Sequence, residues 1–453
     1  MIPRTRPWRV ASLVALVCVS VLMLLQTAQA QEAVKICRND AAELTVTAAR
    51  ITDHYGPIES PAGRKFLVLS TEWRNLLGST LVKDKLLVTP YLVPELDKQL
   101  FVIADGAHTA PLAESVQGRP GCLPTKDFKV PDPLTSVRGN LVFDIPTDAH
   151  DLLLAFIDEK YGPMSAQLVG SPMTVPARTE KNEIVEAFVA NQRVIEDKST
   201  PDTQTIAVDV RLRSIFLPDR KLKCGKVVSI PDWQSRYVQA IADGAYAGAL
   251  VSGPFDTNAT ILPEVFLGGE FVFRVPTHRT ALNVMLYFGE MGTTAGKVRP
   301  RPITLAVKLP GDSKPVPPAT RVNVTTRDTF FDVAIVGIST ADQFGAAKAP
   351  DGQRFLIVDA TVTNISRQPE FFQCMEQLKH VAESGEFSGP DDVSLSGPHP
   401  PAAQLFIPNG EKRSFQMVYA IPAAETRPRI GYASPTEGGS KVLTLPVLKA
   451  PGN

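Results

Sequence analysis

The sequence predicts an all-β protein made of three tandem antiparallel β-sandwiches that follow a signal peptide. Proline is abundant, at 39 of 453 residues, compared with a usual level of about 5%, and proline is poorly tolerated inside helices. Short segments alternate apolar and polar residues with a period of two, which is typical of half-buried strands. The same sequence elements also recur along the chain, which indicates repeated structural units.

The first 30 residues have the features of a secretory signal. A basic start that contains three arginines precedes an apolar stretch at 11–25, and Ala28 and Ala30 give the small-x-small pattern before a cleavage site. An uncleaved anchor is the alternative, although the stretch is shorter than the ~20 residues that span a bilayer. We therefore expect a periplasmic or secreted protein whose mature chain has no integral membrane segment.

The overall charge and composition exclude two broad classes of protein. Lys+Arg and Asp+Glu both number 47, so the net charge is zero. No excess of cations is available to neutralise phosphates, and we expect no nucleic-acid partner. Hydrophobic residues make up 44% of the chain, which is enough to form packed cores and excludes a disordered chain.

The clearest repeat is a turn that leads into a strand. Pro61–Asn75 and Pro350–Asn364 share the proline, a glycine, a basic residue, a Phe-Leu pair and the final asparagine, at an offset of 289. A weaker middle copy keeps the alternation of apolar residues but lacks the glycine and the asparagine. Its apolar positions are Ile206, Val208, Val210 and Leu212.

A second repeat predicts tight hairpins. The segment 103–107 recurs at 241–245 with an offset of 138, and both copies read Ile-Ala-Asp-Gly-Ala. Asp-Gly between strand-like flanks favours a type I′ turn, in which both central residues have positive φ. In the third unit, Ser384-Gly385 occupies the comparable place.

A third repeat closes each unit with a strand that stops at a proline. The segments 139–147 and 269–277 resemble each other, and 416–422 is a third copy. We therefore expect a signal peptide at 1–30 and sandwich units at 38–171, 181–310 and 321–450. A proline-rich linker at 310–320 should be a stiff, extended spacer. Units of many short strands without intervening helices favour sandwiches, and a β-barrel is the alternative.

These motifs together resemble an uncharacterised immunoglobulin-like domain that is found in many bacterial lipoproteins and secreted proteins. The resemblance covers most of the first and third units, whereas the middle unit departs from it. It implies an immunoglobulin-like β-sandwich in each unit and a role in extracytoplasmic binding or assembly. It implies no common catalytic residue.

Four cysteines follow the signal peptide, and an exported chain can oxidise them. Cys37 and Cys122 fall in the same predicted unit, so we expect a possible disulfide between them. Cys224 and Cys374 would either join different units or stay reduced and buried. Trp233 lies in a polar, loop-like stretch and is the candidate for an exposed contact with a ligand.

No pattern in the chain indicates catalysis, a cofactor or a bound metal. The six histidines are scattered, and neither a zinc-protease motif nor a nucleophile elbow occurs. We therefore expect a non-enzymatic exported binding or assembly protein whose partner is an unknown envelope protein or a glycan. One alternative is a glycan-binding accessory protein that uses Trp233, and a second is a hydrolase sited in the loop 388–403 with His399.

Overall fold

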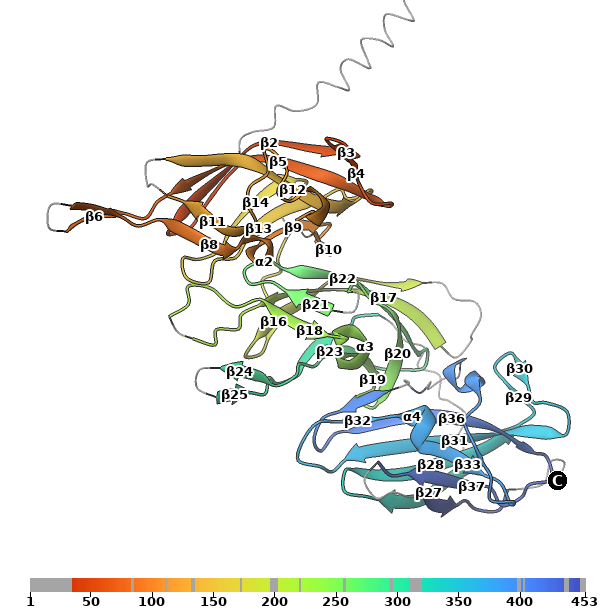
Figure 1. Ribbon diagram of the computed structural model, residues 1–453. Coiled ribbons are helices and arrows are strands. Elements are labelled where there is room, and N and C mark those ends of the chain that lie inside the picture. The colour runs from red at the N-terminus through yellow and green to blue at the C-terminus, as the bar shows by residue number, and fades with distance from the viewer. Residues whose placement is uncertain are drawn as a thin grey trace, which may run out of the picture. The chain divides into compact units, whose positions relative to one another are not determined.

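The computed structural model describes residues 35–448 except 83–84, 107, 111, 132–134, 172, 196–202, 220, 256–257, 294–295, 310–319, 397–400, 402–403 and 436–439. Strands account for 58% and helices for 5% of the structure, which confirms the predicted all-β class. The sheets are mainly antiparallel, and the helices visible in Figure 1 are single short turns. The predicted signal peptide and most of the predicted linker at 310–320 lie outside the described residues.

The chain divides into two compact units. Unit 1 consists of Met1–Val102, Ala110–Ala149 and Met164–Leu168, and unit 2 holds Ile103–Thr109, His150–Pro163 and Val169–Asn453. Unit 2 therefore contains both the predicted middle and the predicted third sandwich. The division into three domains stays a prediction.

Unit 1 is built on a four-stranded antiparallel sheet with the order β1-β2-β5-β12. These strands are β1 (Lys35–Arg38), β2 (Ala42–Thr52), β5 (Arg64–Asn75) and β12 (Ser136–Pro146). Three two-stranded pairs accompany this sheet: β3 (His54–Tyr55) with β4 (Ile58–Glu59), β6 (Ser79–Val82) with β7 (Lys85–Val88), and β8 (Tyr91–Glu95) with β11 (Lys126–Val130). Helical turns occur at α2 (Leu96–Gln99) and η1 (Glu114–Val116). Three more strands include residues of both units: β9 (Leu100–Ala104), β10 (His108–Ala110) and β14 (Met164–Val169). β13 (Leu152–Phe156) belongs to unit 2.

Unit 2 contains a twelve-stranded sheet whose main path runs β15-β16-β17-β22-β20-β36-β31-β28-β27. These strands are β15 (Glu180–Lys181), β16 (Val185–Ile195), β17 (Thr203–Ser214), β22 (Leu267–Pro276), β20 (Tyr246–Ser252), β36 (Lys412–Pro422), β31 (Gln353–Asn364), β28 (Phe331–Ala341) and β27 (Thr320–Arg327). A branch from β20 adds β19 (Val238–Ala242), β23 (Leu282–Leu286) and β26 (Ile303–Ala306). A separate sheet has the order β34 (Phe387–Ser388), β33 (Leu378–Val381), β37 (Arg429–Ala433) and β38 (Ser440–Thr444).

Short pairs and helical turns complete unit 2. The pairs are β18 (Val228–Pro231) with β21 (Asn258–Ile261), β24 (Met291–Thr293) with β25 (Gly296–Val298), β29 (Gln343–Phe344) with β30 (Ala347–Lys348), and β32 (Glu370–Phe372) with β35 (Leu405–Ile407). The helical turns are α3 (Trp233–Tyr237), α4 (Cys374–Gln377) and η2 (Asp392–Ser396). Two main clusters of buried apolar side chains form the core. The first combines strands β16, β17 and β22 with the β19-β23-β26 branch and the β18-β21 pair, and the second combines β28, β31 and β36 with the separate sheet of β33, β37 and β38. This packing is that of a β-sandwich.

The sequence repeats correspond to a three-stranded antiparallel arrangement that occurs three times. We call β2-β5-β12 the first frame, β16-β17-β22 the second frame and β28-β31-β36 the third frame. The central strand has 12 residues in every frame. The opening strand carries a β-bulge each time, between Val46 and Ala48, Val189 and Asn191, or Ile335 and Gly337. A bulge inserts one extra residue and bends the strand.

The asparagine that ends the repeated strand holds a neighbouring loop. Asn75 Nδ2 donates to the carbonyls of Thr89 at 2.9 Å and Val130 at 3.2 Å. Asn364 Nδ2 donates to the carbonyls of Gln368 and Ile407, both at 2.7 Å. In the second frame Ser214 has this position, and its Oγ donates to the Lys226 carbonyl at 2.6 Å. The middle copy thus replaces the asparagine with a smaller side chain that also binds a loop carbonyl.

The two Asp-Gly turns have the predicted backbone conformation. φ is 51° at Asp105 and 64° at Gly106, and it is 49° at Asp243 and 71° at Gly244. Each aspartate also accepts from two backbone amides of another loop through Oδ1: Asp105 from His150 and Asp151, and Asp243 from Thr280 and Ala281. The third hairpin differs, because only Gly385 has positive φ there, at 92°.

Candidate functional site

The strand register identifies one equivalent position in the closing strand of each frame. Asn140 pairs with Ser70 in the first frame, Glu270 with Asp209 in the second, and Gln416 with Asp359 in the third. Two residues earlier in the same strands lie Arg138, Gly268 and Ser414. We call these three residues the docking positions, because hairpin tips bind at two of them.

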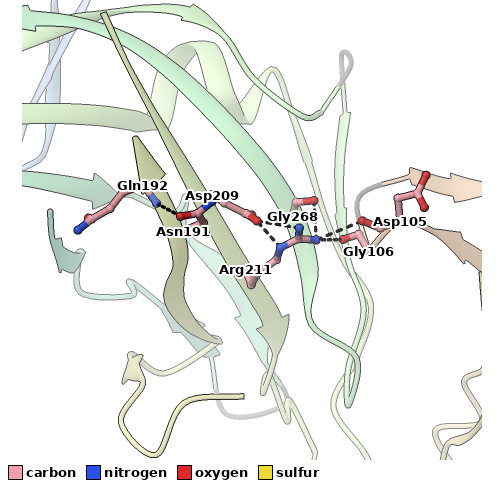
Figure 2. Close-up of polar contacts among 7 residues, drawn as sticks. All are labelled: Asp105, Gly106, Asn191, Gln192, Asp209, Arg211 and Gly268. Atoms are coloured by element: carbon pink, nitrogen blue, oxygen red, sulfur yellow. Dashed lines mark hydrogen bonds and ion pairs between the residues drawn. The ribbon is translucent and has the colours of Figure 1, made fainter. Parts of the chain in front are cut away.

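The tip of the first Asp-Gly hairpin binds at the docking position of the second frame. The Gly268 amide donates to the Gly106 carbonyl at 2.9 Å. Figure 2 shows that Arg211, the cross-strand partner of Gly268, reaches the same carbonyl through Nη1 at 2.7 Å and the Gly268 carbonyl at 3.2 Å. The Asp209 carboxylate lies 2.7 Å from Arg211 Nε, and both side chains are largely buried. The hairpin tip and this frame all belong to unit 2.

The tip of the second Asp-Gly hairpin binds at the docking position of the third frame. The Ser414 amide donates to the Ala245 carbonyl at 3.0 Å, and Tyr246 forms a parallel bridge with Ser414. This bridge joins β20 to β36. The Ser414 hydroxyl lies 2.9 Å from the hydroxyl of its cross-strand partner, Thr361.

A buried polar contact lies next to the second docking contact, at the residue that precedes Ser414. Arg413, 1% exposed, donates from Nη2 to the Tyr287 hydroxyl at 2.7 Å and to Glu411 Oε2 at 2.8 Å. Burial raises the pKa of Tyr287 to about 12, although the Arg413 guanidinium acts in the opposite direction. The tyrosine is therefore neutral at physiological pH, and its oxygen can accept from the guanidinium.

In the first frame the docking position lies beside an open depression of about 440 Å³. Seven residues line it, and none has an aromatic ring: Thr47, Ser70, Thr71, Glu72, Arg138, Gly139 and Asn140. Arg138 Nε lies 2.9 Å from Glu72 Oε2, and 76% of the arginine side chain is exposed. Hydrogen bonds from Ser136 and Arg138 lower the pKa of Glu72, so the carboxylate is charged.

The edge of β12 at Arg138 has no backbone partner within the described part of the chain. The Asn140 amide donates to the Gly121 carbonyl at 2.7 Å, on the edge of β12 that faces away from β5. Residues two apart in an antiparallel strand present their amides to the same edge. The Arg138 amide therefore faces outward, as the amides of Gly268 and Ser414 do at the occupied positions.

The expected Cys37–Cys122 disulfide is not formed, and all four described cysteines are free. Cys37 lies in β1 at one edge of the four-stranded sheet, and Cys122 bridges to Asn140 in β12 at the opposite edge. At least three interstrand spacings of about 4.8 Å therefore separate them, whereas a disulfide needs Cα atoms within about 7 Å. Cys122 Sγ lies 3.3 Å from the Tyr55 hydroxyl. Cys224 and Cys374 are buried thiols.

The interpretation of Trp233 as an exposed contact is wrong. Its side chain is 0% exposed, and its Nε1 donates to the Tyr287 carbonyl at 2.8 Å. The ring stacks on Phe288 with centroids 5.6 Å apart. Its polar sequence neighbours concealed a helical turn, α3, that points the indole into the core.

The hydrolase alternative placed its site around His399, which lies outside the described residues. Within the same insert, Ser388 Oγ lies 3.1 Å from His380 Nδ1, and Glu425 Oε1 lies 2.9 Å from His380 Nε2. The imidazole is 3% exposed and the carboxylate 4%. A catalytic histidine gives its proton to a leaving group, and an imidazole so deeply buried leaves no room for one. We interpret this group as a structural network.

No family model, curated protein or solved structure matches this chain. The resemblance to immunoglobulin-like domains therefore remains a prediction. Among the described residues, no helix combines the length and apolarity needed to cross a membrane. The same part of the chain contains no group of three or more His, Cys, Asp or Glu side chains that could hold a metal ion.

Proposed function

We propose that this chain is a non-enzymatic exported protein of the bacterial cell envelope that acts by binding or assembly. One observation carries the proposal: the same docking position is occupied by a hairpin tip in two frames, and in the first frame no described residue occupies it. A chain that already uses one strand edge for docking twice can use the third edge for a partner. Edge strands with unpaired amides are common sites of protein association.

The chemistry of the open position favours a protein partner over a glycan. Glycan sites commonly offer an aromatic ring for stacking, whereas the seven residues that line the depression provide none, and Trp233 is buried. The depression instead offers an outward backbone amide and the Arg138 guanidinium. Both are donors that suit the carbonyls of a peptide turn.

The test is affinity capture from envelope extract with the mature protein, residues 31–453, as bait. Arg138→Glu is the variant, and Arg299→Glu is the matched control because Arg299 is also an exposed arginine paired with a glutamate, at 2.8 Å from Glu290. We expect a specific protein to be retained by the parent and the control but lost with Arg138→Glu. If every retained protein is indifferent to Arg138, or if the mature protein turns over substrates in a hydrolase screen, the proposal is wrong.

A further inference from the structure

We propose that the occupant of the open docking position is the third hairpin of a second copy of this chain, so that copies associate head to tail. This inference rests on the proposed function and names the partner. Within one chain, each Asp-Gly hairpin tip binds the frame that follows it. Among the described residues, no hairpin tip binds at the first frame, and no frame receives the third hairpin.

The third hairpin is exposed, as an unused tip should be. All residues of 383–388 are exposed. The turn is closed by hydrogen bonds between Ala382 and both Gly385 and Glu386. The turn hydrogen bonds align it with the second tip. The Gly385 amide donates to the Ala382 carbonyl as the Ala245 amide donates to the Ala242 carbonyl, so Gly385 corresponds to Ala245 and Glu386 to Tyr246.

This alignment predicts the contacts between the third hairpin and the first docking position of another copy. Ala245 supplies the carbonyl that the Ser414 amide binds, so Gly385 should supply the carbonyl that the Arg138 amide binds. The Glu386 carbonyl already accepts from the Ala382 amide within the turn. Tyr246 follows the second tip and bridges to Ser414, and Glu386 has the corresponding place in the third tip. Phe387, next to Glu386, is 51% exposed. A large aromatic side chain left exposed beside a free turn is a frequent feature of interaction surfaces.

The third tip and the first docking position can form one charge pair, between Glu386 and Arg138, although the Glu72 carboxylate lies beside Arg138. The third tip carries the carboxylates of Glu383 and Glu386, whereas Arg138 presents a largely exposed guanidinium. In the second frame the arginine that donates to the hairpin carbonyl is Arg211, the cross-strand partner of Gly268. In the first frame the same cross-strand pair consists of Glu72 and Arg138. The arginine of the first frame therefore lies in the closing strand β12, whereas the arginine of the second frame lies in the central strand β17.

Such an interface joins two different surfaces of identical chains. A heterologous contact of this kind forms open chains of copies unless the rotation closes a ring. The contact is small, so the association should be weak and dependent on concentration.

The test is sedimentation velocity of the mature protein from about 1 μM to about 1 mM, the range expected for a small interface. We expect the parent to form species larger than a dimer as concentration rises. Arg138→Glu and Glu386→Lys should each weaken association by about tenfold or more, as expected for loss of a charge pair and a docking contact. Arg299→Glu is the control and should associate like the parent. Circular dichroism checks that every variant is folded.

Mixing the two defective variants separates a head-to-tail contact from a symmetric one. For the mixture Glu386→Ala replaces Glu386→Lys, because lysine at 386 could pair with glutamate at 138 and restore the broken contact. Arg138→Glu retains an intact tip and Glu386→Ala retains an intact first frame, so this mixture should form dimers and stop there. A parent that stays monomeric at every concentration, or that associates regardless of both substitutions, overturns the inference. If Arg138-dependent capture from the extract persists while self-association fails, the proposed function stands with a different partner. If both fail, both proposals are wrong.

Discussion

Replacing Asn364 with alanine should strongly destabilise unit 2. This side chain is completely buried. Its Nδ2 donates to the carbonyls of Gln368 and Ile407, each at 2.7 Å, and its Oδ1 accepts from the Ser366 amide at 2.9 Å. Alanine removes all three hydrogen bonds.

The expected loss follows from these three contacts. Each hydrogen bond contributes about 1 kcal/mol net, and a buried carbonyl or amide left without a partner adds a desolvation cost. We therefore expect the free energy of unfolding to fall by about 3–4 kcal/mol, near the upper end for single substitutions. Asn364→Ser should lose only part of this, because Ser214 holds the corresponding loop in the second frame with a hydroxyl.

Urea unfolding of the mature protein, followed by circular dichroism, measures the loss. Asn323→Ala, at an exposed position of β27, is the control and should change stability by no more than about 0.5 kcal/mol. The transition of unit 1 should not move with either variant. A loss below about 1 kcal/mol for Asn364→Ala, or equal losses for alanine and serine, would refute the reasoning that the asparagine holds the loop by hydrogen bonds.

Three more substitutions test other parts of the structure. Burial alone would raise the pKa of Asp328, but hydrogen bonds from Tyr432, Ser434 and two backbone amides hold it below the ordinary value of 3.8. The charged Asp328 carboxylate stabilises the fold above about pH 4, and this stabilisation is lost as the pH falls through the lowered pKa. Asp328→Asn should therefore reduce the fall in the free energy of unfolding with decreasing pH, as measured by urea unfolding. An unchanged pH dependence would contradict this. Gly106→Ala would place Cβ 2.5 Å from Arg211 Nη1, whereas the Cβ of Gly244→Ala would meet no atom within 4 Å. Amide hydrogen exchange in the first hairpin, 103–109, should therefore speed up more in Gly106→Ala than exchange in the second hairpin, 241–245, speeds up in Gly244→Ala. Equal increases would mean that only the positive φ shared by both glycines matters. Trp233→Ala should lower the free energy of unfolding by about 3–5 kcal/mol, as for other buried aromatics, and a loss under 1 kcal/mol would contradict its core position.

Much of the fold could be predicted from local patterns. A period of two predicts a strand because alternate side chains face opposite sides of a sheet, and Asp-Gly predicts a tight turn because its residues tolerate positive φ. The repeats at offsets of 289 and 138 located the central strands and the hairpin tips. The asparagine that ends the repeated strand was visible as a motif, but its role in holding a loop was not.

The candidate site could be predicted only in part. The Asp-Gly tips were visible in the sequence as turns, but nothing local indicates which strand edge a tip will bind. Gly268 and Arg211 carried no motif, since a glycine and an arginine in a strand have many possible roles. Their importance becomes visible only when the register pairs them across two strands and a hairpin from residues 103–109 binds beside them.

The sequence by itself determined the all-β class, the repeated strand frame and the positions of the tight turns, because short-range sterics and side-chain alternation set these features. The tertiary structure alone decided that Trp233 is buried, that a four-stranded sheet keeps Cys37 and Cys122 apart, and that hairpin tips fill two docking positions while no described residue fills the third. Those outcomes depend on which surfaces meet across long stretches of chain. Packing and the pairing of backbone donors and acceptors decide which surfaces come into contact. The sequence of one segment does not contain that information.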